Sequence, residues 1–246
     1  MKAKYDKIGV SYTTQRKSDP IITEQFHAKL NGAKRILNIG AGTGSYEPQD
    51  IDLIALEPSH EMIAQRKPGS HPVVQGFAEV LPFDHKQFSH TISILSMHHW
   101  KDRVKAYSEI NRVTQEQFVT ITWNPNSEAF WLTRDYFPQI YETDVKIFPT
   151  LEELQDHFEH IEVSPLWIPY DCHDGFLAAY WKRPEAYLKE KVRNSISTFS
   201  TLENLSEGLT QLENDLNSGK WREKNCDVLD LDLFDAGYVI VTAQIK

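Results

Sequence analysis

The stretch Asn38 to Ser59, NIGAGTGSYEPQDIDLIALEPS, decides the fold. It begins with the end of an apolar run and a glycine-rich turn, GAGTG at 40–44, and a second apolar run starts at Ile51. Such a turn after a strand is typical of a nucleotide-binding α/β unit, whose parallel strands are usually joined by a crossover helix. The intervening residues 46–50 are too few for an ordinary helix. The stretch therefore predicts two parallel strands joined by a shortened turn.

The same stretch indicates which nucleotide ligand suits the turn. The dinucleotide fingerprint G-x-G-x-x-G requires a glycine at position 45, where this chain has Ser45. Glu57 ends the second strand, and a carboxylate there can accept hydrogen bonds from both hydroxyls of a ribose. NAD rests its pyrophosphate on the N-terminus of the first crossover helix, whereas S-adenosylmethionine carries no phosphate. The short turn therefore favours a phosphate-free adenosine ligand, although a glycine turn alone is also compatible with simple packing.

The surrounding pattern predicts an α/β domain. Short β-branched runs at 35–39, 52–56, 72–75, 91–95 and 118–122 alternate with polar helical stretches, as in a parallel sheet. Ser59 is a predicted helix cap, and Val104, Tyr107, Ile110 and Val113 form an apolar helical stripe. Further along, the pattern predicts a helix at 151–160, strands at 161–168 and 237–243, and one or two amphipathic helices between these strands.

The composition of the chain argues against several classes of protein. The chain has 246 residues and a formal net charge of −9, which argues against broad nucleic-acid binding. No apolar run is long enough to cross a bilayer, and the N-terminus lacks the apolar core of a secretory signal. The two cysteines, Cys172 and Cys226, are far apart and suggest reduced thiols. We therefore expect a cytoplasmic protein without nucleic-acid or membrane partners.

Five ordered segments, ILNIGAGTG, ALEPS, GFAEVLPF, SILSMHHW and EINRV, together resemble class I S-adenosylmethionine-dependent methyltransferases of the type 11 family. The N-terminal YDKIGVSYTTQRKSDPII and the later YDCHDGFLAAYWKRPEAYLKEKVRNSISTF resemble a small-molecule subgroup of that family. The resemblance implies a Rossmann-like, seven-stranded, mostly parallel sheet with its last strand antiparallel and helical insertions forming a cap. It implies one domain over 1–246, with lid helices at 1–30, a cofactor-binding core at 31–125, additions around one strand at 126–236 and a final strand at 237–246.

The resemblance also implies S-adenosylmethionine as cofactor and roles for particular residues. The glycine turn would wrap the methionine and ribose, Glu57 would hold the ribose, and Pro58 and Met62 would pack on the adenine. Family members commonly have an acidic residue where Phe77 stands, so Phe77 is assigned either to the pocket or to the core. The implied cofactor-binding residues are Tyr12, Arg16, Gly40, Ala41, Gly42, Gly44, Tyr46, Glu57, Pro58, Met62, Phe77, Ala78, Glu79, Leu95, Ser96 and His98.

Catalytic candidates are fewer, because methyl transfer needs a base only if the acceptor must lose a proton. His98 and His99 follow the fourth strand, and His173 belongs to a second polar cluster with Asp171 and Asp174. Each histidine is a candidate base. The alternatives are that His98 lines the cofactor pocket, that His99 is hydrogen-bonded near a helix start, and that Asp174 caps a helix beginning near Gly175. Two adjacent histidines without a third ligand make a weak metal site, so no metal is expected.

The chain is thus predicted to be an enzyme that transfers a methyl group to a small, partly apolar metabolite. Aromatic residues between 126 and 181 suggest an enclosed acceptor pocket, although most of them are expected in the core. The residues are Trp131, Tyr136, Phe137, Trp167, Tyr170, Tyr180 and Trp181. The alternatives are a non-catalytic adenosine-binding module and an NAD-dependent oxidoreductase; Ser45 and the short turn disfavour the latter.

Overall fold

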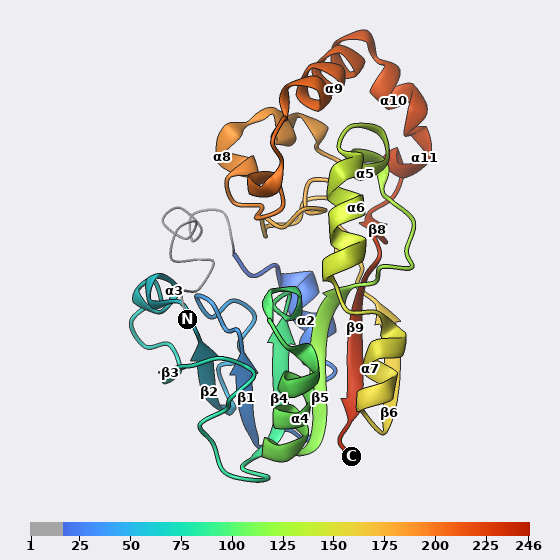
Figure 1. Cartoon of the computed structure of the whole chain (residues 1–246). Coiled ribbons are helices and arrows are strands. Elements are labelled where there is room, and N and C mark those ends of the chain that lie inside the picture. The colour runs from blue at the N-terminus through green and yellow to red at the C-terminus, as the bar shows by residue number, and fades with distance from the viewer. Residues whose placement is uncertain (1–16) are drawn as a thin grey trace.

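The computed structural model describes residues 17–246 and contains a seven-stranded sheet in the order β3-β2-β1-β4-β5-β9-β6 (Figure 1). Its strands are β1 (Arg35–Ile39), β2 (Asp52–Glu57), β3 (Val73–Gln75), β4 (Phe88–Ile94), β5 (Thr114–Trp123), β6 (His160–Pro165) and β9 (Tyr238–Gln244). Neighbouring strands from β3 to β5 are parallel, whereas β9 runs antiparallel to both β5 and β6. The predicted Rossmann-like sheet with an antiparallel last strand is confirmed.

The unusual β1–β2 connection is also confirmed. The strands pair in parallel from Arg35 opposite Asp52 to Ile39 opposite Leu56, and residues 40–51 contain no helix. Because parallel neighbours must be joined across the sheet, a loop makes the crossover that a helix usually makes. That loop lies at the carboxyl edge of the sheet, where open α/β folds bind ligands.

Helices cover both faces of the sheet because its strands are apolar on both sides. One apolar cluster contains Leu37 and residues of α4 (Arg103–Val113) and α7 (Leu151–His157), whereas Ile36 lies in the other cluster with residues of α2 (Pro20–His27). Asp19 caps α2, and its Oδ1 accepts hydrogen bonds from Ile21 N and Ile22 N. In α4 the predicted stripe is partly wrong, because Val104 is exposed while the rest of it is buried.

The cap follows β5 and lies above the carboxyl end of the sheet (Figure 1). It consists of α5 (Trp131–Asp135), α6 (Pro138–Ile147), η3 (Pro184–Leu188), α8 (Glu190–Arg193), η4 (Phe199–Thr201), α9 (Ser206–Ser218), α10 (Lys220–Lys224) and α11 (Cys226–Leu229), with β7 (Ile168–Pro169) and β8 (Leu233–Phe234) as a small antiparallel sheet. The amphipathic run after residue 190 is therefore more broken than predicted, with α9 as its main helix.

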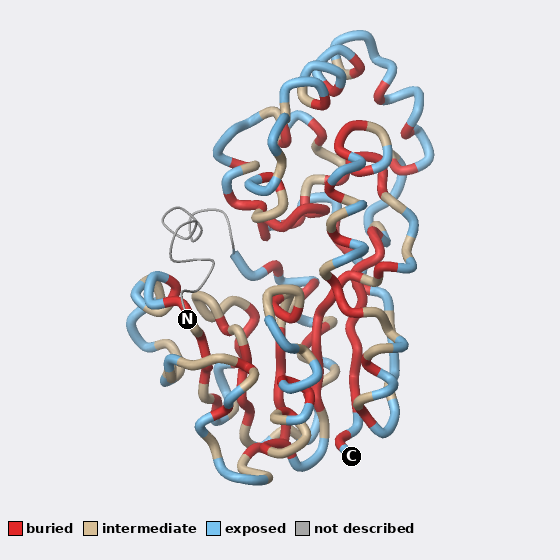
Figure 2. Tube along the Cα trace, viewed as in Figure 1, coloured by how far each residue is buried: buried red, intermediate tan, exposed pale blue. Residues whose placement is uncertain are grey.

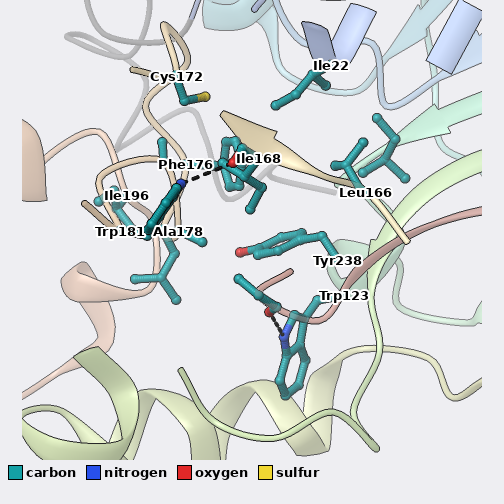
Figure 3. Packing of buried hydrophobic residues seen from close by; sticks show 14 of the residues in the cluster. Ile22, Trp123, Leu166, Ile168, Cys172, Phe176, Ala178, Trp181, Ile196 and Tyr238 are labelled. Atoms are coloured by element: carbon teal, nitrogen blue, oxygen red, sulfur yellow. Dashed lines mark hydrogen bonds between the residues drawn. The ribbon is translucent and has the colours of Figure 1, made fainter. Parts of the chain in front are cut away.

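The cap and the sheet share an apolar core. Figure 2 shows buried residues continuing from the strands into the cap. In this shared cluster, Trp181 Nε1 donates to Ile168 O at 3.1 Å, and Trp123 Nε1 donates to Ala236 O at 3.1 Å (Figure 3). Buried indole N–H groups usually find such partners. The cap is thus fixed to the sheet by packed aromatic rings, and the indole N–H groups of Trp123 and Trp181 are hydrogen-bonded within this packing.

Two predicted elements end early. The helix predicted at 151–160 ends at His157, since β6 already begins at His160. The strand predicted at 161–168 ends at Pro165, because the chain then leaves the sheet: the backbone N–H and C=O of Trp167 both bond the Gln25 side chain of α2 at 2.9 Å. No helix within residues 17–246 is long and apolar enough to cross a bilayer.

Gly208 in α9 gives a test of the cap packing. A Cβ at this position would collide with Tyr136 O and approach Phe137 Cε1 to 2.6 Å. We expect Gly208→Ala to lower the free energy of unfolding by about 2 kcal/mol through overpacking, measured by urea denaturation. Thr210→Ala, on the exposed face of the same helix, is the control. A Gly208→Ala protein as stable as the Thr210→Ala protein would contradict this packing.

Candidate active site

A cavity of about 270 Å³ lies at the carboxyl end of the sheet. It is bounded by the glycine turn after β1, the end of β2, the segment after β3 and the segment after β4. Its lining residues are Asn38, Gly40, Ala41, Gly42, Thr43, Ser45, Tyr46, Leu56, Glu57, Pro58, Met62, Phe77, Ala78, Glu79, Ile94, Leu95, Ser96, His99, Trp100 and Lys101. The order of the strands reverses beside β1, so the cavity occupies the switch point where such sheets bind ligands.

The glycines of the turn are required by their protein neighbours. Gly40 has φ of 72°, and a Cβ there would lie 2.5 Å from Ser96 Oγ. Gly44 has φ of 89°, and its Cβ would lie 2.9 Å from Glu47 Oε2. Positive φ and close approach both exclude ordinary side chains. The turn therefore passes tightly between neighbouring segments and leaves its backbone in the cavity wall.

Glu57 joins the turn to β2. Its Oε2 accepts a hydrogen bond from Gly42 N at 2.8 Å, and its Oε1 accepts one from Ser59 N at 2.9 Å. Ser59 in turn caps the short helix α3 (His60–Ala64), as predicted, because its side chain accepts from Met62 N. The carboxylate is buried but lines the cavity. The Glu57 side chain therefore forms part of the cavity wall and at the same time fixes the glycine turn to the start of α3.

A buried ion pair holds the β1–β2 loop. Glu47 Oε2 lies 2.7 Å from Arg66 Nη2, and the two side chains are 2% and 5% exposed. Glu47 Oε1 accepts a further hydrogen bond from Asn38 Nδ2 at 2.9 Å. Glu47 is not in the described lining of the cavity, because its carboxylate is engaged beneath the loop. It ties the loop to β1 and to the end of α3.

Tyr46 connects the loop to more distant segments. It is a non-glycine residue with φ of 65°, and its hydroxyl donates to Asp174 Oδ2 at 2.9 Å. Its backbone N donates to Ser18 Oγ at 2.9 Å, and its carbonyl lies 2.9 Å from His27 Nε2. Asp174 is buried, and no helix begins beside it at Gly175, so its predicted capping role is wrong. It instead binds Tyr46 and Gly175 N.

The segment after β3 forms the opposite wall. Phe77 lines the cavity and makes a single β-bridge to Val80. Glu79 also lines the cavity, and its Oε1 accepts hydrogen bonds from Lys101 N at 2.8 Å and from Asp102 N at 3.3 Å. This carboxylate therefore anchors the start of α4 while remaining in the wall.

The end of β4 separates two cavities. Leu95 has φ of 50° and lines both the large cavity and a second one of about 50 Å³. In the following turn η2 (Met97–His99), the two histidines diverge: His99 lines the large cavity and His98 the small one. His98 stacks on Phe148 with ring centroids 4.2 Å apart. Positive φ is a strained conformation for leucine, and such strain concentrates at functional sites.

The structure brings most of the predicted residues together. Tyr12 and Arg16 lie outside the described residues. Among residues 17–246, Gly44 and His98 are not in the described lining of the large cavity, and exposed His173 lines neither cavity. Of the aromatic set, Trp167 and Tyr170 are exposed and none lines either cavity. Sequence reasoning missed lining residues that lie inside the five motif segments but to which the resemblance assigns no role, namely Asn38, Thr43, Leu56, Ile94 and Trp100. It also missed Lys101 and Asp144, which lie outside every motif.

Comparison with known proteins agrees with this geometry. A methyltransferase-domain family model, type 11, matches residues 37–118. A solved structure of a proposed methyltransferase from an antibiotic biosynthesis pathway of Anabaena variabilis is 33% identical, with a TM-score of 0.85, and covers 93% of this chain and 98% of that chain. Geranyl diphosphate C-methyltransferase from Streptomyces coelicolor, solved with S-adenosyl-L-homocysteine, shares the fold at 13% identity and a TM-score of 0.51, over 91% of this chain and 76% of that one.

Among curated proteins, 2-methyl-6-phytyl-1,4-hydroquinone methyltransferase 2 of Oryza sativa is 27% identical over 135 residues, which are 51% of this chain and 37% of the rice protein. The chain matches half or less of the length of its curated relatives. The fold and the cavity define a class I Rossmann-like methyltransferase domain. The chain belongs to the type 11 family of S-adenosylmethionine-dependent methyltransferases.

The contribution of the buried Glu47–Arg66 pair to the free energy of unfolding can be tested by mutation. Arg66→Ala would leave the Glu47 carboxylate buried without its cation, which typically costs about 3 kcal/mol or more. We expect that decrease in the free energy of unfolding by urea denaturation. Lys67→Ala, at the adjacent exposed position, should change stability little. Equal stability of the two variants would show that the pair does not hold the loop.

Proposed function

We propose that this protein transfers the methyl group of S-adenosylmethionine to a small, partly apolar acceptor. The observation that carries the proposal is the Glu57 carboxylate, which lines the large cavity while it binds Gly42 N and Ser59 N. It places a ribose acceptor, the glycine turn and the start of α3 in one rigid unit.

The cavity residues fit this cofactor. Two carboxylates, Glu57 and Glu79, lie in the described lining with one lysine, Lys101. Carboxylates repel a pyrophosphate but tolerate a sulfonium cation. In addition, residues 40–51 present no helix N-terminus to a phosphate. These features support a phosphate-free adenosine ligand over a dinucleotide.

Each wall of the cavity has an assigned task in this proposal. Glu57 accepts the ribose hydroxyls, Met62 and Phe77 supply apolar surface to the adenine, and the glycine turn lies along the amino-acid portion. When bound, S-adenosylmethionine supplies an activated methyl group on its sulfonium. Leu95, between the two cavities, directs the acceptor toward that group and excludes water, so positioning is the main source of acceleration.

A proton acceptor is available if the methyl acceptor requires one. His99 lines the large cavity and His98 the small one, with ring centroids 3.8 Å apart. Both therefore remain candidates for proton transfer, whereas the exposed His173 is in the described lining of neither cavity.

The acceptor class is supported by the relatives' names. The protein from Anabaena variabilis is assigned to an antibiotic biosynthesis pathway, and the rice relative is named for a prenylated hydroquinone. The phytyl group in the name of the rice relative is apolar, which supports a small acceptor with an apolar part. The second cavity, lined by Phe148, Phe176 and Tyr238 among others, has matching apolar surface.

Glu57→Ala tests the ribose contact. We expect the affinity for S-adenosylhomocysteine, measured by calorimetry, to fall about tenfold or more, because charge-assisted hydrogen bonds are lost. The variant also releases Gly42 N and Ser59 N, so its thermal midpoint should be recorded. Glu61→Ala, an exposed carboxylate in α3, is the matched control. An unchanged affinity in folded Glu57→Ala protein would remove Glu57 from the site.

The function itself is tested by ligand preference and turnover. We expect calorimetry to detect S-adenosylhomocysteine and not NADH, and a metabolite panel to yield S-adenosylhomocysteine as a product. NADH binding without S-adenosylhomocysteine binding would support an oxidoreductase. Binding of S-adenosylhomocysteine with no turnover on a broad panel would favour a non-catalytic module.

A further inference from the structure

We propose that the second cavity, here called the acceptor chamber, binds the methyl acceptor through an amine whose charge is stabilised by Asp144. This inference rests on the proposed function and goes beyond it by assigning the acceptor atom to nitrogen. The chamber is lined by Leu95, His98, Asp144, Phe148, Phe176, Leu177, Ile196, Ser197, Thr198 and Tyr238.

The location of the chamber links it to methyl transfer. Leu95 lines both cavities, so the acceptor chamber and the large cavity share one side chain as a wall. Leu95 N donates to Ile121 O of β5 at 2.9 Å, which fixes this wall to the sheet despite its positive φ. A group in the chamber is therefore the neighbour of a cofactor in the large cavity, at the end of β4.

Asp144 is the one carboxylate in the described lining of the chamber. It is 7% exposed, although it lies on the cap helix α6 between the exposed residues Glu142 and Lys146. Phe148 lies one turn later and also lines the chamber. Residues four apart share one face of a helix, so α6 presents a carboxylate and an aromatic ring to the same space.

The remaining walls favour a cation next to an apolar group. The rings of Phe176 and Tyr238 pack edge to face with centroids 5.0 Å apart, and Phe148 stacks on His98 at 4.2 Å. Aromatic faces attract cations, and a buried carboxylate attracts them more strongly. Ser197 and Thr198 add hydroxyl groups from the cap. A small amine with a flat or branched apolar part matches this lining.

The charge that develops on the acceptor during methyl transfer differs between a nitrogen acceptor and an oxygen acceptor. The bound ammonium first gives one proton to water or to a histidine in the wall. The freed lone pair then forms the new N–C bond while the methyl–sulfur bond breaks, and the positive charge passes from sulfur to nitrogen, so the product is an N-methylated ammonium. Asp144 stabilises the charge that develops in the chamber. A hydroxyl acceptor would instead lose its proton and develop negative charge beside Asp144, which the carboxylate opposes.

The experiment uses pairs of probes that differ only in the accepting atom. Phenethylamine and 2-phenylethanol, tyramine and tyrosol, and hexylamine and hexanol are titrated into the full chain saturated with S-adenosylhomocysteine, and binding is followed by ligand-observed NMR. Turnover with S-adenosylmethionine is measured for the same probes. We expect at least one amine to bind about tenfold or more tightly than its alcohol, and to be methylated.

Asp144→Asn should abolish this preference, with amine affinity reduced about tenfold or more, while S-adenosylhomocysteine affinity and the thermal midpoint stay near the wild-type values. Asp144→Glu keeps the charge and should retain the preference. Glu142→Gln, which removes an exposed carboxylate from the same helix, should behave as wild type.

The outcomes distinguish this inference from the proposed function. Failure of the wild-type chain to bind S-adenosylhomocysteine would refute the proposed function. Normal S-adenosylhomocysteine binding with alcohols preferred, with no amine bound, or with the amine preference intact in Asp144→Asn would overturn the amine assignment alone.

Discussion

The buried pair of Glu47 and Arg66 is the interaction on which the ligand-binding edge of this protein depends. Parallel strands are normally spaced by a crossover helix whose own hydrogen bonds define the shape of the connection. Here residues 40–51 have no helix, so side chains must define it. Glu47 bonds Asn38 of β1 and Arg66 after α3, and Tyr46 bonds α2 and the 172–175 segment through its backbone and hydroxyl. Tertiary contacts thus replace secondary structure.

This replacement explains why so many constrained residues gather at one edge. Gly40, Gly44 and Tyr46 all have positive φ within one short loop. Glycine adopts such φ values without strain, whereas the positive φ of Tyr46 costs free energy for which the surrounding contacts must compensate. The benefit is a backbone that passes close beneath the cavity, with Glu57 closing the loop onto β2. The glycines are fixed by Ser96 and Glu47, so they are required before any ligand binds.

The sequence predicts the sheet well and the cap poorly, for physical reasons. Strands such as β1 and β9 are short apolar runs bounded by turn signals, and five ordered motifs indicate the family. Apart from α6 and α9, the helices of the cap have three to five residues, which is too few for periodicity to emerge, and β7 and β8 have two residues each. In the site, the sequence singles out Glu57 because it ends a strand at the carboxyl edge of the sheet, and the structure places it in the cavity wall. The position of Asp144 in a cavity wall cannot be predicted from the sequence, because a single carboxylate on a helix is usually exposed and only tertiary packing buries it.

The continuous aromatic core has a consequence for how this chain can diversify. Trp123 of β5 and Trp181 of the cap belong to one apolar cluster, so the cap does not have a hydrophobic core separate from that of the sheet. Replacing the whole cap with that of a relative would remove the aromatic contacts between the cap and the sheet. New acceptor preferences are instead accessible by replacing the few residues that face the acceptor chamber while the aromatic framework stays in place. The side chains that maintain the fold are therefore different from the side chains that determine which acceptor is bound.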